Sequence, residues 1–182
     1  MKIDISGAAL SEERISQRMR LIIESGPAGR MPEVKLISIG ATGIYEVVED
    51  YCCPIDYCSI GRKFPSESRH QDGAVPQLCS ITVKAGFQFD RASIPRIFWI
   101  LVSKDDLSNV APLFHDLLYR YEGKLHRDWV KPYTTFSRYE ADNLFFHLMA
   151  RSGVSSWRLH VAYQAVCHFS AFAWGRQRHH VT

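Results

Sequence analysis

The feature that most constrains the fold is a change in hydrophobic pattern near residue 105. Between residues 33 and 83 the apolar stretches are short and strand-like, at 33–40, 44–51 and 77–83. After residue 105 the apolar residues have the spacing of helices, in the segments 105–123, 137–153 and 155–175. A run of strands followed by a run of helices is typical of the α+β class. We therefore expect a small, mostly antiparallel sheet packed against three main helices.

Residues that start and stop helices support these boundaries. Ser137 and Glu140 have the spacing of a capping box, and Gly153 closes the same segment. Gly123 is a matching stop for the helix before it, in which Pro112 is tolerated only in the first turn. Three residues compete as the N-cap of that helix: Asp105, Ser108 and Asn109.

The length of 182 residues favours one domain with an extension. We expect an N-terminal extension over 1–43, with a helix at about 11–24, then a main domain over 44–176 and a basic tail over 177–182. The segment 61–76 is polar and rich in Pro, Gly and Ser, so we expect a loop there.

Charge and composition exclude several classes of protein. The chain has 22 basic and 19 acidic residues, a balance that carries no signature of nucleic-acid binding. The longest apolar runs, such as 97–102, are far too short for a transmembrane segment. The N-terminus has charges where a secretion signal has its apolar stretch, and the odd count of five cysteines points to reduced thiols. We expect a cytoplasmic protein; export by a route without such a signal stays open.

Two polar residues stand in the middle of the apolar run 111–121, which reads APLFHDLLYRY. At about 100° per residue, His115 falls at the edge of the apolar arc, whereas Asp116 points away from it. His115 can therefore face a cavity between elements, and Asp116 is expected to face a loop or the solvent. In a shared site the two side chains would have different tasks.

The next helix carries a carboxylate, Asp142, inside its own apolar arc. A buried charge needs a partner, because an unpaired one is very unfavourable. In one interpretation Asp142 caps a loop or pairs with an arginine such as Arg96 or Arg138. The other makes Asp142 the partner of His115, so that the carboxylate fixes the tautomer and leaves the second ring nitrogen as a base.

Asp90 also has two interpretations. It can cap the turn before Pro95, which is a common use of aspartate ahead of serine and proline. Alternatively, Asp90, His115 and Asp116 could bind a divalent cation, calcium or zinc, although no metal-binding signature is present. Ser93 as a nucleophile is a weaker hypothesis, since it lacks the motif that positions one.

An interaction surface is a further hypothesis. The stretch 52–64 and the loop that follows it combine aromatic, basic and thiol side chains away from the expected core, and such residue types anchor interfaces. The alternative for this stretch is an irregular loop at an edge.

Four segments follow one another in a recognisable order. The run 81–101, ITVKAGFQFDRASIPRIFWIL, precedes a His-Asp-x-x-Tyr helix, an Arg-x-Glu-Ala-Asp helix and a closing aromatic helix that ends in Ala-Trp-Gly. Over 44–175 this order resembles a phage and prophage family, domain-of-unknown-function family 1353. The matching positions are Gly86, Phe87, Asp90, Ala92, Ser93, Ile94, Pro95, His115, Asp116, Tyr119, Arg138, Glu140, Ala141 and Asp142. Arg91 replaces the usual glycine of that family, and Lys84 the usual proline.

The stretch HDLLYRY is also similar to the His-Asp helix of secreted phospholipases A2. This resemblance implies that His115 activates a water, that Asp116 binds calcium and that Tyr119 supports the pair. The departures are clear: the flanking cysteines are apolar here, and no glycine-rich calcium loop precedes the helix. The aspartate that orients the histidine in that family would fall on Leu148, so Asp142 takes this role only if the helices pack differently.

Two functions follow from these patterns. The first is a phage or prophage hydrolase that acts on a lipid ester or a cell-wall bond, with His115 as base and Asp142, Asp116 and Asp90 as orienting or metal-binding groups. The second is a non-catalytic phage accessory protein, such as a virion component or an inhibitor that binds a host protein. In that case the same polar residues form a buried network that holds two helices together.

Overall fold

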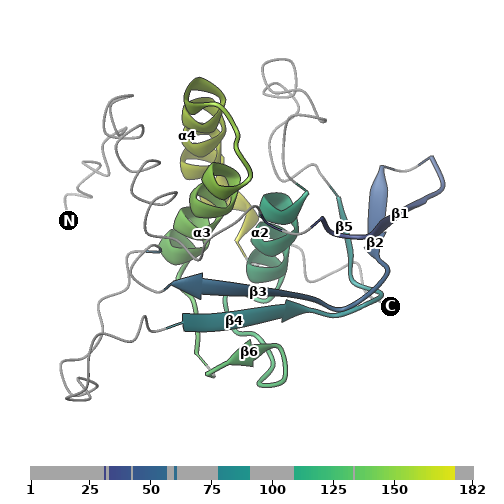
Figure 1. Ribbon diagram of the computed structural model, residues 1–182. Coiled ribbons are helices and arrows are strands. Elements are labelled where there is room, and N and C mark those ends of the chain that lie inside the picture. Colours follow the sequence, from purple (N-terminus) through teal and green to yellow (C-terminus); the bar gives the residue numbers. More distant parts are fainter. Residues whose placement is uncertain are drawn as a thin grey trace, which may run out of the picture.

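Figure 1 shows the computed structural model, which describes residues 31, 33–41, 43–56, 60, 78–90, 109–132 and 134–174. The strands are β1 (Leu36–Ile39), β2 (Ile44–Val47), β3 (Tyr51–Asp56), β4 (Leu78–Val83), β5 (Gln88–Asp90) and β6 (Val130–Lys131). The helices are α2 (Val110–Arg120), α3 (Arg138–Arg151) and α4 (Ser156–Ala173). Strands precede the helices along most of the chain, so the expected α+β class is confirmed.

The strands form two small antiparallel sheets, where a single sheet was expected. One has the order β1-β2-β5 and the other the order β3-β4-β6. Because β2 leads into β3 and β4 leads into β5, these four strands make one long ribbon that bends between the sheets. At the bend, the Val47 amide donates to the Phe87 carbonyl (3.0 Å) and the Gly86 amide donates to the Val47 carbonyl (2.8 Å). Backbone hydrogen bonds therefore continue along the ribbon through the bend, although its two halves belong to different sheets.

The side chain of Asp50 stabilises the bend of this ribbon. Its carboxylate accepts from Lys84 Nζ (2.7 Å) and from the Ala85 amide (2.9 Å). These two donors keep the pKa of Asp50 below its ordinary value, the lysine more strongly than the amide. Gly86 supplies the left-handed backbone that the turn requires, with φ at +83°. The expected strand over 44–51 is thus interrupted after Val47, because residues 48 and 49 form a bend before β3 begins at Tyr51.

The stretch 52–64 contributes to the core where the structure describes it. In β3, Tyr51, Cys53 and Ile55 are buried, whereas Cys52 and Pro54 are exposed, which is the alternation of a strand with one buried face. The expectation that this stretch lies away from the core is therefore wrong for Cys53 and Ile55. The short strands β5 and β6 were also not expected; β6 forms inside the connector 124–136 by pairing with β4.

The helix α2 lies at the centre of the molecule. It packs against α3 and β5, and the ring of Phe114 meets the ring of Tyr51 on β3 at 6.0 Å. Every residue from Val110 to Tyr119 is buried, and so is every residue of α3 from Ala141 to Ala150. Over these residues both helices are enclosed on all sides, so the polar side chains within them lie in the interior of the protein.

The helix ends agree with the sequence. The predicted capping box of α3 is present in both directions: the Ser137 side chain accepts from the Glu140 amide, and Glu140 accepts from the Ser137 amide. Gly123 follows α2 with φ at +72°, and a Cβ atom there would lie 1.8 Å from the carbonyl oxygen of Phe136. Gly153 follows α3 with φ at +79°. Asn109 is the N-cap of α2, without a side-chain hydrogen bond to the helix.

Several expectations fall outside the described residues. They concern the N-terminal helix at 11–24, the loop over 61–76 and the basic tail over 177–182. Within the part of the chain that the structure describes, no helix combines the length and hydropathy needed to cross a membrane.

Candidate functional site

The candidate site lies between α2 and α3, where a buried titratable side chain of one helix meets a buried titratable side chain of the other. His115 of α2 is 3% exposed and Asp142 of α3 is 4% exposed. The His115 Nε2 atom lies 3.2 Å from Asp142 Oδ1. The structure therefore brings together the two residues that the sequence paired by hypothesis. The helices pack in the register that makes Asp142, and not Leu148, the partner of the histidine.

Aromatic rings fix the plane of the imidazole. Tyr119 lies one turn after His115 on the same face, and its ring stacks on the imidazole with centroids 3.9 Å apart. Phe145 approaches His115 at 5.2 Å, and Trp174 meets the ring of Tyr119 edge-on at 4.8 Å. The Tyr119 hydroxyl donates to the same atom of Asp142, Oδ1, that faces His115. One carboxylate oxygen thus joins the histidine and the tyrosine.

This arrangement decides the tautomer of a neutral His115. A carboxylate oxygen only accepts hydrogen bonds, so Nε2 carries the proton and Nδ1 carries a lone pair. The Nδ1 atom is buried and has no hydrogen-bond partner among the residues that the structure describes. An unmatched buried acceptor is unfavourable by about 1–3 kcal/mol. Such a group calls for an explanation, and a catalytic role or a bound water is a common one.

Asp116 departs from its expected position. It was expected to face a loop or the solvent, yet it is only 1% exposed. The reason is that α2 is enclosed on all sides, so the direction away from its apolar arc also leads into the interior. His115 and Asp116 still point in different directions, as neighbours on a helix must.

A metal site is not formed by the described side chains alone. Among them, no group of three or more His, Cys, Asp or Glu is placed to hold a metal ion. Asp116 is described, but Asp90 is described only as the last backbone position of β5, paired with Ile44. The hypothesis of a calcium or zinc ion bound by Asp116 and Asp90 therefore stays a prediction.

The remaining predicted site residues lie elsewhere. Ser93 and Arg96 fall outside the described residues. Glu140 belongs to the capping box of α3, where its carboxylate accepts from the amide (2.8 Å) and the hydroxyl (2.9 Å) of Ser137. Its position in the structure is that of a helix cap.

Arg120 connects the site helix to β5. Its guanidinium donates to the Gln88 carbonyl (2.7 Å) and lies 4.5 Å from the centre of the Phe87 ring. This contact ties the last turn of α2 to the strand that ends at Asp90. The sequence did not single out Arg120, because neither partner lies near it along the chain.

A further polar residue near the site, Asn143, was missed by the sequence analysis. Asn143 is fully buried next to Asp142, and its side chain bonds the Ile60 carbonyl and the Tyr163 hydroxyl. A signal was present, because Asn143 is a second polar residue in an apolar helix segment. Its two partners lie 83 and 20 positions away, so no local pattern could identify them.

Comparison with known proteins gives one family. The model of the family described as "Protein of unknown function (DUF1353)" matches residues 67–166. These residues include all of α2 and α3, the first part of α4 and the His115–Asp142 pair. No curated protein and no solved structure is matched by the chain.

Proposed function

The chain belongs to the DUF1353 family of proteins of unknown function, and from the geometry around His115 we propose that it is a hydrolase with this histidine as its base. The observation that carries the proposal is the buried Nδ1 lone pair on an imidazole whose Nε2 is held by Asp142. A histidine oriented by a carboxylate, with its other nitrogen available, is the usual arrangement of a general base near neutral pH.

The reaction that fits this arrangement is the hydrolysis of an ester. Nδ1 takes a proton from a water molecule while the water oxygen attacks the ester carbonyl. The resulting imidazolium is stabilised by the Asp142 carboxylate, which Tyr119 also holds. The tetrahedral intermediate then expels the alcohol oxygen, which receives the proton from Nδ1. Positioned acid–base catalysis of this kind contributes about 10²- to 10⁴-fold in rate.

The surroundings of the histidine favour an apolar substrate. Tyr119 and Phe145 flank the imidazole, and Trp174 lies against Tyr119. Of the two substrates expected from the sequence, we therefore favour a lipid ester over a cell-wall bond. The phage or prophage origin of the protein remains part of this proposal, and it rests on the resemblance of the sequence.

A second candidate function is favoured by the burial of the pair. His115 is only 3% exposed, so a substrate reaches Nδ1 only after neighbouring side chains move. A non-catalytic phage accessory protein that binds a host or phage protein would need no such movement. In that protein, the bonds among His115, Tyr119 and Asp142 would serve to hold α2 against α3.

One variant separates the two candidates. We expect the wild-type protein to cleave p-nitrophenyl esters, with longer acyl chains preferred, and we expect His115→Asn to lose at least about 100-fold in kcat. The free energy of unfolding of His115→Asn should stay near the wild-type value or rise, because active sites are often strained. The hydrolase proposal fails if the variant is strongly destabilised and neither protein cleaves esters, phospholipid vesicles or dye-labelled cell walls.

The metal hypothesis has its own test. If Asp116 binds calcium or zinc, adding the ion at about 100 times its Kd stabilises the folded protein by about 2.7 kcal/mol. For a chain of this size that corresponds to a rise in Tm of roughly 5–10 °C. The rise should be absent in Asp116→Asn. No rise in the wild-type protein at millimolar ion contradicts the hypothesis.

A further inference from the structure

The side chain of Asn143 is a polar group that the proposed reaction does not use. It is fully buried, and it directly follows Asp142 on α3. Successive residues on a helix point about 100° apart. Asp142 is directed at α2, where it meets His115, whereas Asn143 is directed at other elements of the fold.

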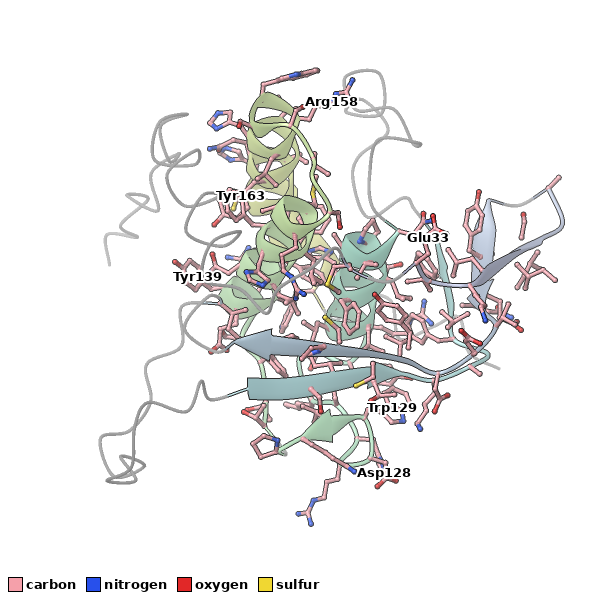
Figure 2. All side chains as sticks on the ribbon, in the orientation of Figure 1. Glu33, Asp128, Trp129, Tyr139, Arg158 and Tyr163 are labelled. Carbon is pink, nitrogen blue, oxygen red and sulfur yellow. The ribbon has the colours of Figure 1, made fainter. Side chains whose placement is uncertain are left out.

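Both ends of the Asn143 amide have partners on separate segments. The Nδ2 atom donates to the carbonyl of Ile60, at 3.2 Å, and Oδ1 accepts from the Tyr163 hydroxyl of α4, at 3.4 Å. Ile60 is itself fully buried, and Tyr163 is 7% exposed. Figure 2 shows Tyr163 on α4 at the side of α3, whereas Arg158 lies at the far end of α4. One side chain thus joins α3 to α4 and to the chain that follows β3.

These two bonds limit the rotation of α3 about its axis. Apolar packing alone is non-directional, whereas hydrogen bonds have narrow geometry. A rotation of about 20° moves an atom that lies about 5 Å from the helix axis by roughly 2 Å. A displacement of that size would break the 3.2 Å contact between Asp142 and His115.

We propose that Asn143 is a positioning residue of the His115 site, with Tyr163 as its anchor on α4. The bonds to Ile60 and Tyr163 set the rotation of α3, and this rotation aims the Asp142 carboxylate at His115 Nε2. The role of Asn143 in catalysis rests on the proposed hydrolase function; its role in orienting the histidine does not.

The test uses NMR of the His115 ring nitrogens in the full-length protein, with the signals assigned by their loss in His115→Asn. The variants are Asn143→Leu, Tyr163→Phe and the double variant. Tyr163→Phe removes one oxygen and keeps the ring that lies edge-on to Phe146 at 5.1 Å. The control is Ser152→Ala, which removes a hydrogen bond from Ser152 Oγ to the Leu148 carbonyl within the same stretch of chain. That bond links α3 to no other element.

We expect both single variants to shift the Nε2–H and Nδ1 resonances of His115, and Ser152→Ala to leave them in place. Because Tyr163 acts through Asn143, the double variant should shift them no further than Asn143→Leu does. Unchanged His115 resonances in Asn143→Leu, or equal shifts in Ser152→Ala, overturn the proposal. If Asn143→Leu does not fold, the shift in Tyr163→Phe decides, and its absence overturns the proposal.

Activity provides a second and independent readout. Where the wild-type protein cleaves a p-nitrophenyl ester, Asn143→Leu should lower kcat by about 10- to 100-fold and leave KM nearly unchanged, since a misplaced base slows the chemical step. A shifted His115 resonance in a protein that cleaves no ester refutes the hydrolase proposal and leaves the positioning role intact. An altered KM with unchanged His115 resonances and kcat refutes the positioning role alone.

Discussion

One oxygen atom organises the residues of the candidate site. Asp142 Oδ1 faces His115 Nε2 and accepts from the Tyr119 hydroxyl, and the rings of these two partners stack. The three side chains therefore depend on one another, and a change in one alters the hydrogen bonds of the others. Substitutions that differ by one atom or one charge are the most informative here.

The charge of Asp142 can be separated from its hydrogen bonds. Asp142→Asn keeps an oxygen that accepts from Nε2 and from Tyr119, but it removes the charge that stabilises the imidazolium. We expect kcat on an ester to fall about 100-fold or more. Asp142→Leu removes both bonds and should in addition lower the free energy of unfolding by about 3 kcal/mol or more, measured by urea denaturation. Wild-type kcat in Asp142→Asn would contradict a catalytic role for the pair.

The Tyr119 hydroxyl can be removed while its ring stays. Tyr119→Phe keeps the stack on His115 and the contact with Trp174. It removes a donor to a buried carboxylate, so we expect the free energy of unfolding to fall by about 1.5–3 kcal/mol. The matched control is Tyr139→Phe, because Tyr139 is 62% exposed, and it should change stability by less than about 0.5 kcal/mol. Equal stability of the two variants would show that the Tyr119 bond contributes nothing.

At the scale of elements, the ends of α2 and α3 are set by short local signals. The capping box of Ser137 and Glu140 begins α3, and a glycine follows each of these helices. The two glycines have similar backbone angles but different surroundings. A Cβ at Gly123 would meet the Phe136 carbonyl at 1.8 Å, whereas a Cβ at Gly153 would meet nothing within 4 Å. The first glycine is required by contact and by conformation, the second by conformation alone.

This difference predicts unequal effects of the same substitution. Gly153→Ala should lower the free energy of unfolding by about 1–2 kcal/mol, the effect of a left-handed backbone with a side chain. Gly123→Ala should lower the free energy of unfolding by clearly more, because the Phe136 backbone must also move. This movement would strain the hydrogen bond that the Phe136 amide donates to the Gly123 carbonyl (2.9 Å). Urea denaturation of the two variants measures both values. Equal losses in the free energy of unfolding would mean that the chain after α2 accommodates the added Cβ atom without a further loss of stability.

At the scale of the whole molecule, burial links folding to pH. Burial raises the pKa of the Cys53 thiol to about 12, from 9.0, and that of Tyr51 to about 12, from 10.0. Both side chains belong to the buried face of β3. Below pH 9 both groups are neutral in the folded and in the unfolded chain, so neither makes stability depend on pH. Above pH 9, the unfolded chain loses these protons at a lower pH than the folded chain does, and this difference favours unfolding.

We therefore expect the free energy of unfolding to fall as pH rises from about 9 to about 12. A group that is ionised only in the unfolded state lowers this free energy by about 1.4 kcal/mol per pH unit. Urea denaturation at a series of pH values measures the slope. Cys53→Val should reduce the slope that begins near pH 9 and keep the part that Tyr51 adds above pH 10. An unchanged slope in Cys53→Val would contradict the assignment to this thiol.

Much of the fold and part of the site could be predicted. The helices over 137–153 and 155–175, the capping box and the strands at 33–40 and 77–83 all correspond to described elements. The contact of His115 with Asp142 was one of two interpretations of Asp142, suggested by two polar residues in apolar arcs. Three features were not predicted: the bend between β2 and β3, the strand β6 and the burial of Asp116. Each depends on a contact between residues far apart in the sequence.

The sequence by itself determined which residues form helices and which polar side chains must find partners in the interior. Periodicity, caps and glycine stops act within a few residues, so the chain displays them without a structure. Only the tertiary structure decided that Asp142 meets His115, that Tyr119 shares its oxygen, and that Asn143 joins α3 to α4 and to Ile60. These contacts depend on how α2, α3 and α4 rotate against one another, and that rotation is set by packing over the whole core.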